Sequence, residues 1–137
     1  MSARFYLWAS ALSGAVSVAL GAFGAHGLKK VVSVDMLATY QTGVQYQFIH
    51  SLALLALAIL LFMPVAKGVS KLLKLSANLM IVGIMLFSGS LYTMTLMSAA
   101  DGFPAWLGPI TPIGGLAFIM GWIFLLVAAF KLPIDEQ

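Results

Sequence analysis

Apolar residues dominate four long stretches of the chain, and short polar segments separate them. The stretches cover about residues 5–25, 46–63, 75–97 and 112–130, and no Asp, Glu, Lys or Arg lies well inside any of them. The hydrocarbon core of a bilayer is about 30 Å thick, which an α-helix of roughly 20 apolar residues spans. The pattern therefore predicts an all-α integral membrane protein, a four-helix bundle that forms a single domain over residues 1–137.

The segment before the second stretch, residues 33–47, is more polar but keeps a helical period. Its apolar residues recur at spacings of three and four and form one face, made of Leu37, Tyr40, Val44 and Phe48. Ser33 or Asp35 is placed to cap the start of this helix. We expect a short amphipathic interfacial segment, followed by a bend near Gly43 into the second span.

Composition supports the membrane class and excludes several others. Of the 137 residues, 62% are apolar or aromatic and only 8% are charged, whereas about 25% are charged in an ordinary soluble domain. Such a chain has too little polar surface for a water-soluble globule. The net charge is only +3 and the basic residues flank the apolar stretches, so nucleic acid is not an expected partner. The chain has no cysteine, which excludes disulfides and thiolate chemistry.

The basic residues are divided unequally between the two sides of the predicted bundle. One side receives Arg4, Lys67, Lys71, Lys74 and Lys131, whereas the other receives only Lys29 and Lys30. Because cytoplasmic loops carry the excess of Lys and Arg, we expect both termini in the cytoplasm.

Small residues recur along the first span at alternating spacings of four and three. They are Ser10, Gly14, Ser17, Gly21 and Gly24. In lipid, helix association depends on close packing, which small residues allow. The spacing predicts a packing seam along which a second helix lies in left-handed contact.

Two histidines are the titratable groups of most interest. His26 ends the first span, and His50 lies one or two turns inside the second. Two neutral imidazoles can hold a haem iron or a metal ion, although a pair is too few for a closed zinc site. The alternative is structural: His26 bonds to carbonyls of its last turn, and His50 bonds to Tyr46 or Gln47 or across to another helix. We favour the structural alternative and expect no cofactor and no metal.

Other polar residues within or beside the spans form a candidate cluster with these histidines. The cluster comprises His26, Gln41, Gln45, Tyr46, Gln47, His50, Ser88, Ser90 and Tyr92. The spans lack the buried charged residues of ion pumps, and no acid is placed to orient a histidine beside a serine nucleophile. We therefore expect no catalytic residue, and an interhelical hydrogen-bond network is the favoured interpretation.

The segment 108–115 reads Gly-Pro-Ile-Thr-Pro-Ile-Gly-Gly and precedes the fourth span. Residues before a proline avoid the helical region, and Pro112 suits a first helical turn with Thr111 as its cap. A rigid helix entry is favoured over a re-entrant element.

At these motifs the chain resembles the small transmembrane protein 256 family, also called domain of unknown function 423. The resemblance is carried by GAFGAHGL at residues 21–28, Tyr46-Gln-x-x-His50, LFSGSLY at residues 86–92 and GPITPIGG at residues 108–115. It implies a multi-pass protein of bacterial inner membranes and no enzymatic activity.

The functional hypothesis is a non-enzymatic structural or accessory protein, such as a scaffold, an assembly factor or an envelope-stabilising component. Its expected partners are the lipid bilayer and either a second copy or another membrane protein. One alternative is a channel or carrier for a neutral or weakly polar solute, lined by Gln41, Gln45, His50, Ser88, Ser90 and Tyr92. A weaker alternative is a haem- or metal-binding accessory protein that uses His26 and His50.

Overall fold

The computed structural model describes residues 1–99 and 102–132, and this part of the chain is helical with no strand. Its long helices are α1 (Ala3–His26), α2 (Val34–Phe62), α3 (Ser70–Gly83), α4 (Gly89–Ser98) and α5 (Ile110–Lys131). A π-helical turn, η3 (Ile84–Ser88), joins α3 to α4, so the three form one rod. Short 3-10 turns are η1 (Leu28–Lys30), η2 (Pro64–Val69) and η4 (Ala105–Leu107). Four helical segments are long and apolar enough to cross a membrane, as the sequence predicts.

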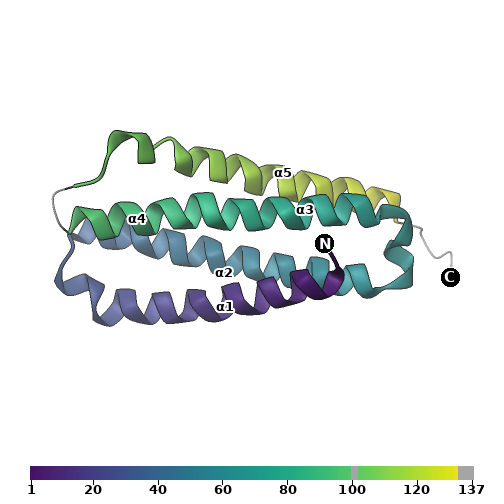
Figure 1. Cartoon of the computed structure of the whole chain (residues 1–137), viewed down its shortest axis with the longest axis horizontal. Coiled ribbons are helices and arrows are strands. Elements are labelled where there is room, and N and C mark those ends of the chain that lie inside the picture. The colour runs from purple at the N-terminus through teal and green to yellow at the C-terminus, as the bar shows by residue number, and fades with distance from the viewer. Residues whose placement is uncertain (100–101, 133–137) are drawn as a thin grey trace.

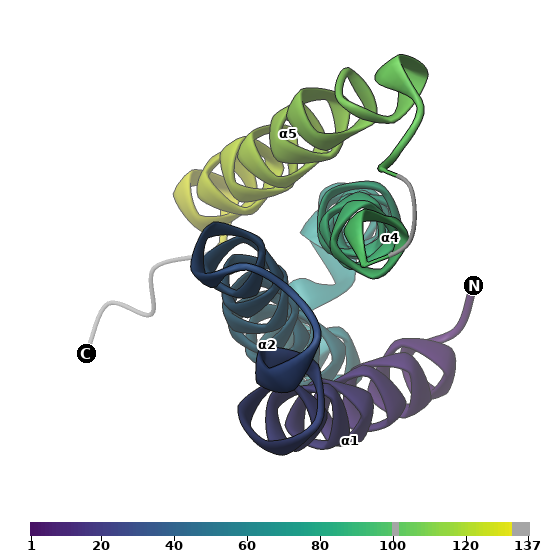
Figure 2. The same ribbon diagram turned by 90° about the vertical axis from the view of Figure 1, so that its left-hand side faces the viewer.

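The four spans lie side by side, with α1 and α5 on opposite sides of the central elements (Figures 1 and 2). α1 packs chiefly on α2, whereas α5 packs chiefly on α3 and η3. α2 also contacts α3, η3 and α4, so it is the central helix of the bundle. The start of α1, the η2 connection and the end of α5 lie at one end of the bundle, and η1 and η4 lie at the other (Figure 1).

The helix ends follow from local chemistry. Ser2 caps α1, and its Oγ accepts a hydrogen bond from the Phe5 amide at 3.3 Å. Of the two residues that the sequence offers as a cap for α2, Ser33 is the one used: its Oγ accepts from the Met36 amide at 3.3 Å. α2 ends at Phe62, two residues before Pro64, because a proline disfavours helical backbone at the residue before it.

The helix is not interrupted near Gly43, so the segment expected at the interface forms the first turns of the helix that contains the second span. α2 continues through Gly43 as one helix of 29 residues. Gly43 is buried, and a Cβ added there would lie 2.9 Å from Cε1 of Tyr92. The glycine therefore serves a close approach between α2 and α4 rather than a hinge, which sequence spacing alone does not distinguish.

The segment 108–115 leads directly into α5, as predicted for a rigid helix entry. Thr111 is not the cap: α5 begins at Ile110 after Pro109, which makes no side-chain cap. The Thr111 hydroxyl instead lies 2.7 Å from Oγ of Ser90 on α4. Gly114 lies directly against the Phe87 backbone of η3, and a Cβ added there would overlap that backbone. The close approach of α5 to the π-helical turn thus depends on this glycine.

The predicted seam on α1 faces α2 over only part of its length. Ser10, Ser17 and Gly24 are buried, and a Cβ added at Gly24 would lie 2.9 Å from Cε1 of Tyr40. A Cβ added at Gly21 would lie 3.4 Å from Cγ1 of Val44, which is an ordinary van der Waals contact. Gly14 departs from the prediction, because nothing lies within 4 Å of a Cβ added there.

Apolar packing and one buried tyrosine fix the end of the bundle that holds η2. The core includes Leu54, Leu57 and Met80, all fully buried. Tyr6 of α1 is also buried, and its hydroxyl donates to Oδ1 of Asn78 on α3 at 2.9 Å. Large apolar side chains such as Trp8 remain on the outside, where a helical membrane protein meets lipid.

We predict that Gly114→Ala lowers the free energy of unfolding by about 1–3 kcal/mol, because the new methyl group overlaps the Phe87 backbone. Gly115→Ala is the matched control, since the nearest atom to its added Cβ is 3.8 Å away. Thermal unfolding in one detergent compares the two variants. Equal stability of the two variants would show that the α5–η3 approach is not tight.

Candidate functional site

A polar network centred on Gln47 joins three helices inside the bundle. The buried Gln47 side chain donates from Nε2 to the Ser13 carbonyl oxygen of α1 at 3.0 Å. Its Oε1 accepts from the Tyr92 hydroxyl of α4 at 2.8 Å. Because a carbonyl can only accept, the Ser13 contact fixes which end of the amide faces α1. Ser51 adds to the network, since its Oγ lies 2.7 Å from both Ser13 Oγ and the Gln47 carbonyl oxygen.

His50 uses both ring nitrogens within the protein. Its Nδ1 lies 2.7 Å from the Tyr46 carbonyl oxygen, and its Nε2 accepts from the Trp122 indole nitrogen of α5 at 3.2 Å. A carbonyl requires a donor and an indole N–H requires an acceptor, so this pattern selects the neutral imidazole with the proton on Nδ1. The ring also stacks on Phe118, with 3.5 Å between ring centroids. The geometry leaves no lone pair of His50 free for a metal.

His26 is separate from this arrangement. It is exposed at the end of α1, and its Nδ1 lies 3.0 Å from the Ala22 carbonyl oxygen one turn earlier, as the structural interpretation predicts. His50 instead faces α5, on the other side of α2 from α1. Across residues 1–99 and 102–132 there is no group of three or more His, Cys, Asp or Glu side chains that could hold a metal ion.

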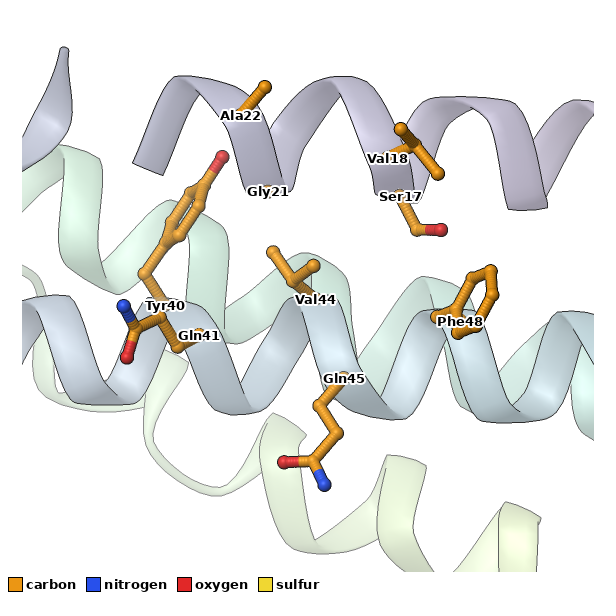
Figure 3. A pocket seen from close by; sticks show the side chains of 9 residues that line it. All are labelled: Ser17, Val18, Gly21, Ala22, Tyr40, Gln41, Val44, Gln45 and Phe48. Atoms are coloured by element: carbon orange, nitrogen blue, oxygen red, sulfur yellow. The ribbon is translucent and has the colours of Figure 1, made fainter. Parts of the chain in front are cut away.

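Gln41 and Gln45 do not join Gln47. Both are exposed, and they line a groove of about 350 Å³ between α1 and α2, shown in Figure 3. Gly21 of the seam and the buried Tyr40 line the same groove. The Tyr40 hydroxyl donates to the Leu20 carbonyl oxygen at 3.1 Å, so it too is used for helix contact.

The remaining predicted residues surround the π-helical turn. Ser90 Oγ donates to the Phe87 carbonyl oxygen at 2.9 Å in addition to meeting Thr111. Tyr46 packs its ring on Phe87 with 4.5 Å between centroids. Ser88 is buried, and its Oγ has no partner within the described chain. Ser88 is therefore a buried member of the cluster whose hydroxyl the network does not use.

Four of the candidate residues line two different grooves. Tyr46 and His50 line a groove of about 410 Å³ with Trp122 on the α5 side of α2, whereas Gln41 and Gln45 line the groove on the α1 side. Gln47 and Tyr92 are bonded to each other between the helices.

Sequence reasoning missed three members of the network: Ser13, Ser51 and Trp122. A signal existed for Trp122, because an indole N–H in an apolar span needs an acceptor. Ser13 and Ser51 carried no comparable signal, since a serine in a helix commonly bonds to its own backbone.

The fold and these internal hydrogen bonds define a multi-pass helical membrane protein with four spans. Residues 20–115 match the family described as Protein of unknown function (DUF423). The chain belongs to this family, which confirms the resemblance seen in its motifs.

Bacterial relatives match along nearly their whole length. A UPF0382 membrane protein of Haemophilus influenzae is 43% identical over 126 residues, which cover 92% of this chain and 94% of the relative. The UPF0382 inner membrane protein YgdD of Escherichia coli K12 is 39% identical over 132 residues, covering 96% and 94%. The UPF0382 membrane protein YwdK of Bacillus subtilis is 39% identical over 128 residues, covering 93% and 98%. A comparison with solved structures finds no match.

We predict that His50→Leu and Trp122→Phe are energetically coupled, because each removes one half of the same hydrogen bond. Interhelical hydrogen bonds in membranes average about 0.6 kcal/mol and reach about 1.7, so the double-mutant cycle should give a coupling energy in that range. Unfolding of the four proteins in one detergent measures it. His50→Gln, which keeps an acceptor, should lose less stability than His50→Leu. Strict additivity of the two substitutions would contradict the assigned contact.

Proposed function

We propose that this chain is a non-enzymatic structural or accessory protein of the bacterial inner membrane, acting as a scaffold, an assembly factor or an envelope-stabilising component. The observation that carries the proposal is the use of polar side chains as ties between helices. Gln47 and Tyr92 satisfy each other, and both nitrogens of His50 are bonded. Groups consumed in this way hold the bundle together and are not free to bind a substrate.

The relatives support the membrane part of this proposal. All three are named as membrane proteins, and none of the names refers to a reaction. A structural role acts through protein and lipid contacts, and the proposed partners are the bilayer and either a second copy or another membrane protein.

The test combines native membranes with reconstituted liposomes. After mild solubilisation we expect the chain in a complex of one defined mass above its own 14.6 kDa, and His50→Gln should keep that complex. Liposomes that hold the purified chain should pass glycerol no faster than protein-free liposomes. A glycerol flux that disappears in a folded His50→Gln variant would support the carrier instead, and a stoichiometric haem or metal lost in that variant would support a cofactor protein.

We further propose that the end of the bundle with η2 faces the cytoplasm. Arg4, Lys67, Lys71, Lys74 and Lys131 belong to the elements at that end, and Lys29 and Lys30 belong to η1 at the other (Figure 1). The C-terminal residue lies outside the described residues.

Because the chain has no cysteine, single cysteines give a clean test of this orientation. We predict that Lys30→Cys reacts with a membrane-impermeant maleimide added outside intact cells, whereas Ser2→Cys and Gln137→Cys react only after permeabilisation. Labelling of Ser2→Cys from outside, with Lys30→Cys protected, would reverse the orientation.

A further inference from the structure

A small cavity with basic walls lies at the end of the bundle that holds η2. It measures about 230 Å³ and is formed where the start of α1 meets the connection between α2 and α3. Two lysines, Lys67 of η2 and Lys74 of α3, line it together with Ser70 and Ala3. Lys67 is exposed and Lys74 is half-buried.

The walls of this cavity are held in place by the core. Tyr6, fully buried one turn after Ala3, donates its hydroxyl hydrogen bond to Asn78, one turn after Lys74. Ala66, which also lines the cavity, is buried in the core cluster. A hydrogen bond between α1 and α3 and the buried Ala66 therefore hold the walls of the cavity in place.

The electrostatic environment of the cavity favours an anion. α1 begins at Ala3 and α3 begins at Ser70, and a helix N-terminus carries partial positive charge. Lys71 adds a further positive charge nearby on α3. Asp35 is the single acidic residue of the described chain, and it lies in the first turn of α2 at the opposite end of the bundle.

The size and depth of the cavity indicate a particular anion. Its volume is below the roughly 300–1,000 Å³ of sites that enclose a whole small molecule, and it lies where the apolar spans end, at the headgroup level of a bilayer. Basic pockets between membrane helices suit anionic lipid headgroups on the cytoplasmic side, which is where we propose that this end of the bundle lies. We propose that this cavity binds the phosphate of an anionic phospholipid, with Lys67 and Lys74 as the cationic ligands and Ser70 as a hydroxyl donor.

The experiment uses the full chain in a neutral detergent and three probes, namely phosphatidylglycerol, phosphatidylcholine and inorganic phosphate. The apparent Kd comes from the rise of the unfolding temperature with probe concentration. Phosphatidylglycerol should stabilise the protein at lower concentrations than phosphatidylcholine, and inorganic phosphate should have little effect. A lysine near anionic lipid contributes about 1 kcal/mol, so Lys67→Gln and Lys74→Gln should each raise the Kd for phosphatidylglycerol about fivefold.

Lys71→Gln is the matched control, because Lys71 carries the same charge on the same helix but does not line the cavity. It should change the Kd for phosphatidylglycerol less than twofold. Equal losses in all three variants would show general surface attraction and overturn the proposal. Stabilisation by inorganic phosphate equal to that by phosphatidylglycerol would replace the lipid with a soluble anion.

A second control concerns Asp135 and Glu136, which lie outside the described residues. The double variant Asp135→Asn and Glu136→Gln should bind phosphatidylglycerol as the parent does. A severalfold tighter Kd would show that the chain's own acidic residues compete with the lipid for an anion site, and would support the proposal. A severalfold weaker Kd would show that lipid binding depends on the tail and not on the cavity, and would contradict it. Unfolding temperatures without added lipid confirm that every variant is folded.

Discussion

A polar side chain in the hydrocarbon core has no water to bond to, so its partner must come from the protein. Gln47 shows how much of this bundle follows from that constraint. It stands on the central helix, with its amide nitrogen bonded to the α1 backbone and its amide oxygen bonded to Tyr92 of α4. Sliding any of these helices along another would break one of the two bonds. These two bonds therefore fix how far α1 and α4 are shifted along α2, and small residues allow the helices to pack closely in that position.

The same constraint organises the other side of α2. His50 bonds to its own helix and to Trp122 of α5, and Phe118 covers its ring. α5 comes close to the rod of α3, η3 and α4 where Gly114 lies against Phe87. Phe87 belongs to the π-helical turn of that rod. A π-helical turn is frequent at functional sites, but here it presents Phe87 to Tyr46 and Phe118 as packing. His50, which the sequence offered as a candidate ligand, thus links α2 to α5 by a hydrogen bond.

Much of this fold was predictable from the sequence. The thickness of the membrane determines how long each apolar stretch must be, and buried polar side chains must find hydrogen-bond partners. Four apolar stretches predicted four helices long enough to span a membrane. The expected hydrogen bonds of both histidines to carbonyls one turn earlier are also present. The wrong predictions concern glycine, because a glycine can serve either as a hinge or as a point of close contact between helices. Gly43 suggested a bend but provides a close approach to Tyr92. Gly14 fits the seam by spacing, but a Cβ added there would have no neighbouring atom within 4 Å. The sequence also did not show that Gln47 is bonded inside the bundle while Gln41 and Gln45 are exposed. The partners of Gln47 are 34 and 45 positions away in the sequence.

The central claim is that buried polar groups act as ties between helices, and Gln47 with its neighbour Gln45 tests it most directly. The free energy of unfolding should be measured in one detergent for Gln47→Leu and Gln45→Leu. Gln47→Leu strands the Tyr92 hydroxyl and the Ser13 carbonyl, so it should lose about 1–3 kcal/mol. Gln45 is exposed in the groove between α1 and α2, so its variant should stay within about 0.5 kcal/mol of the parent. Equal effects of the two substitutions, or a Gln47→Leu variant as stable as the parent, would contradict the account.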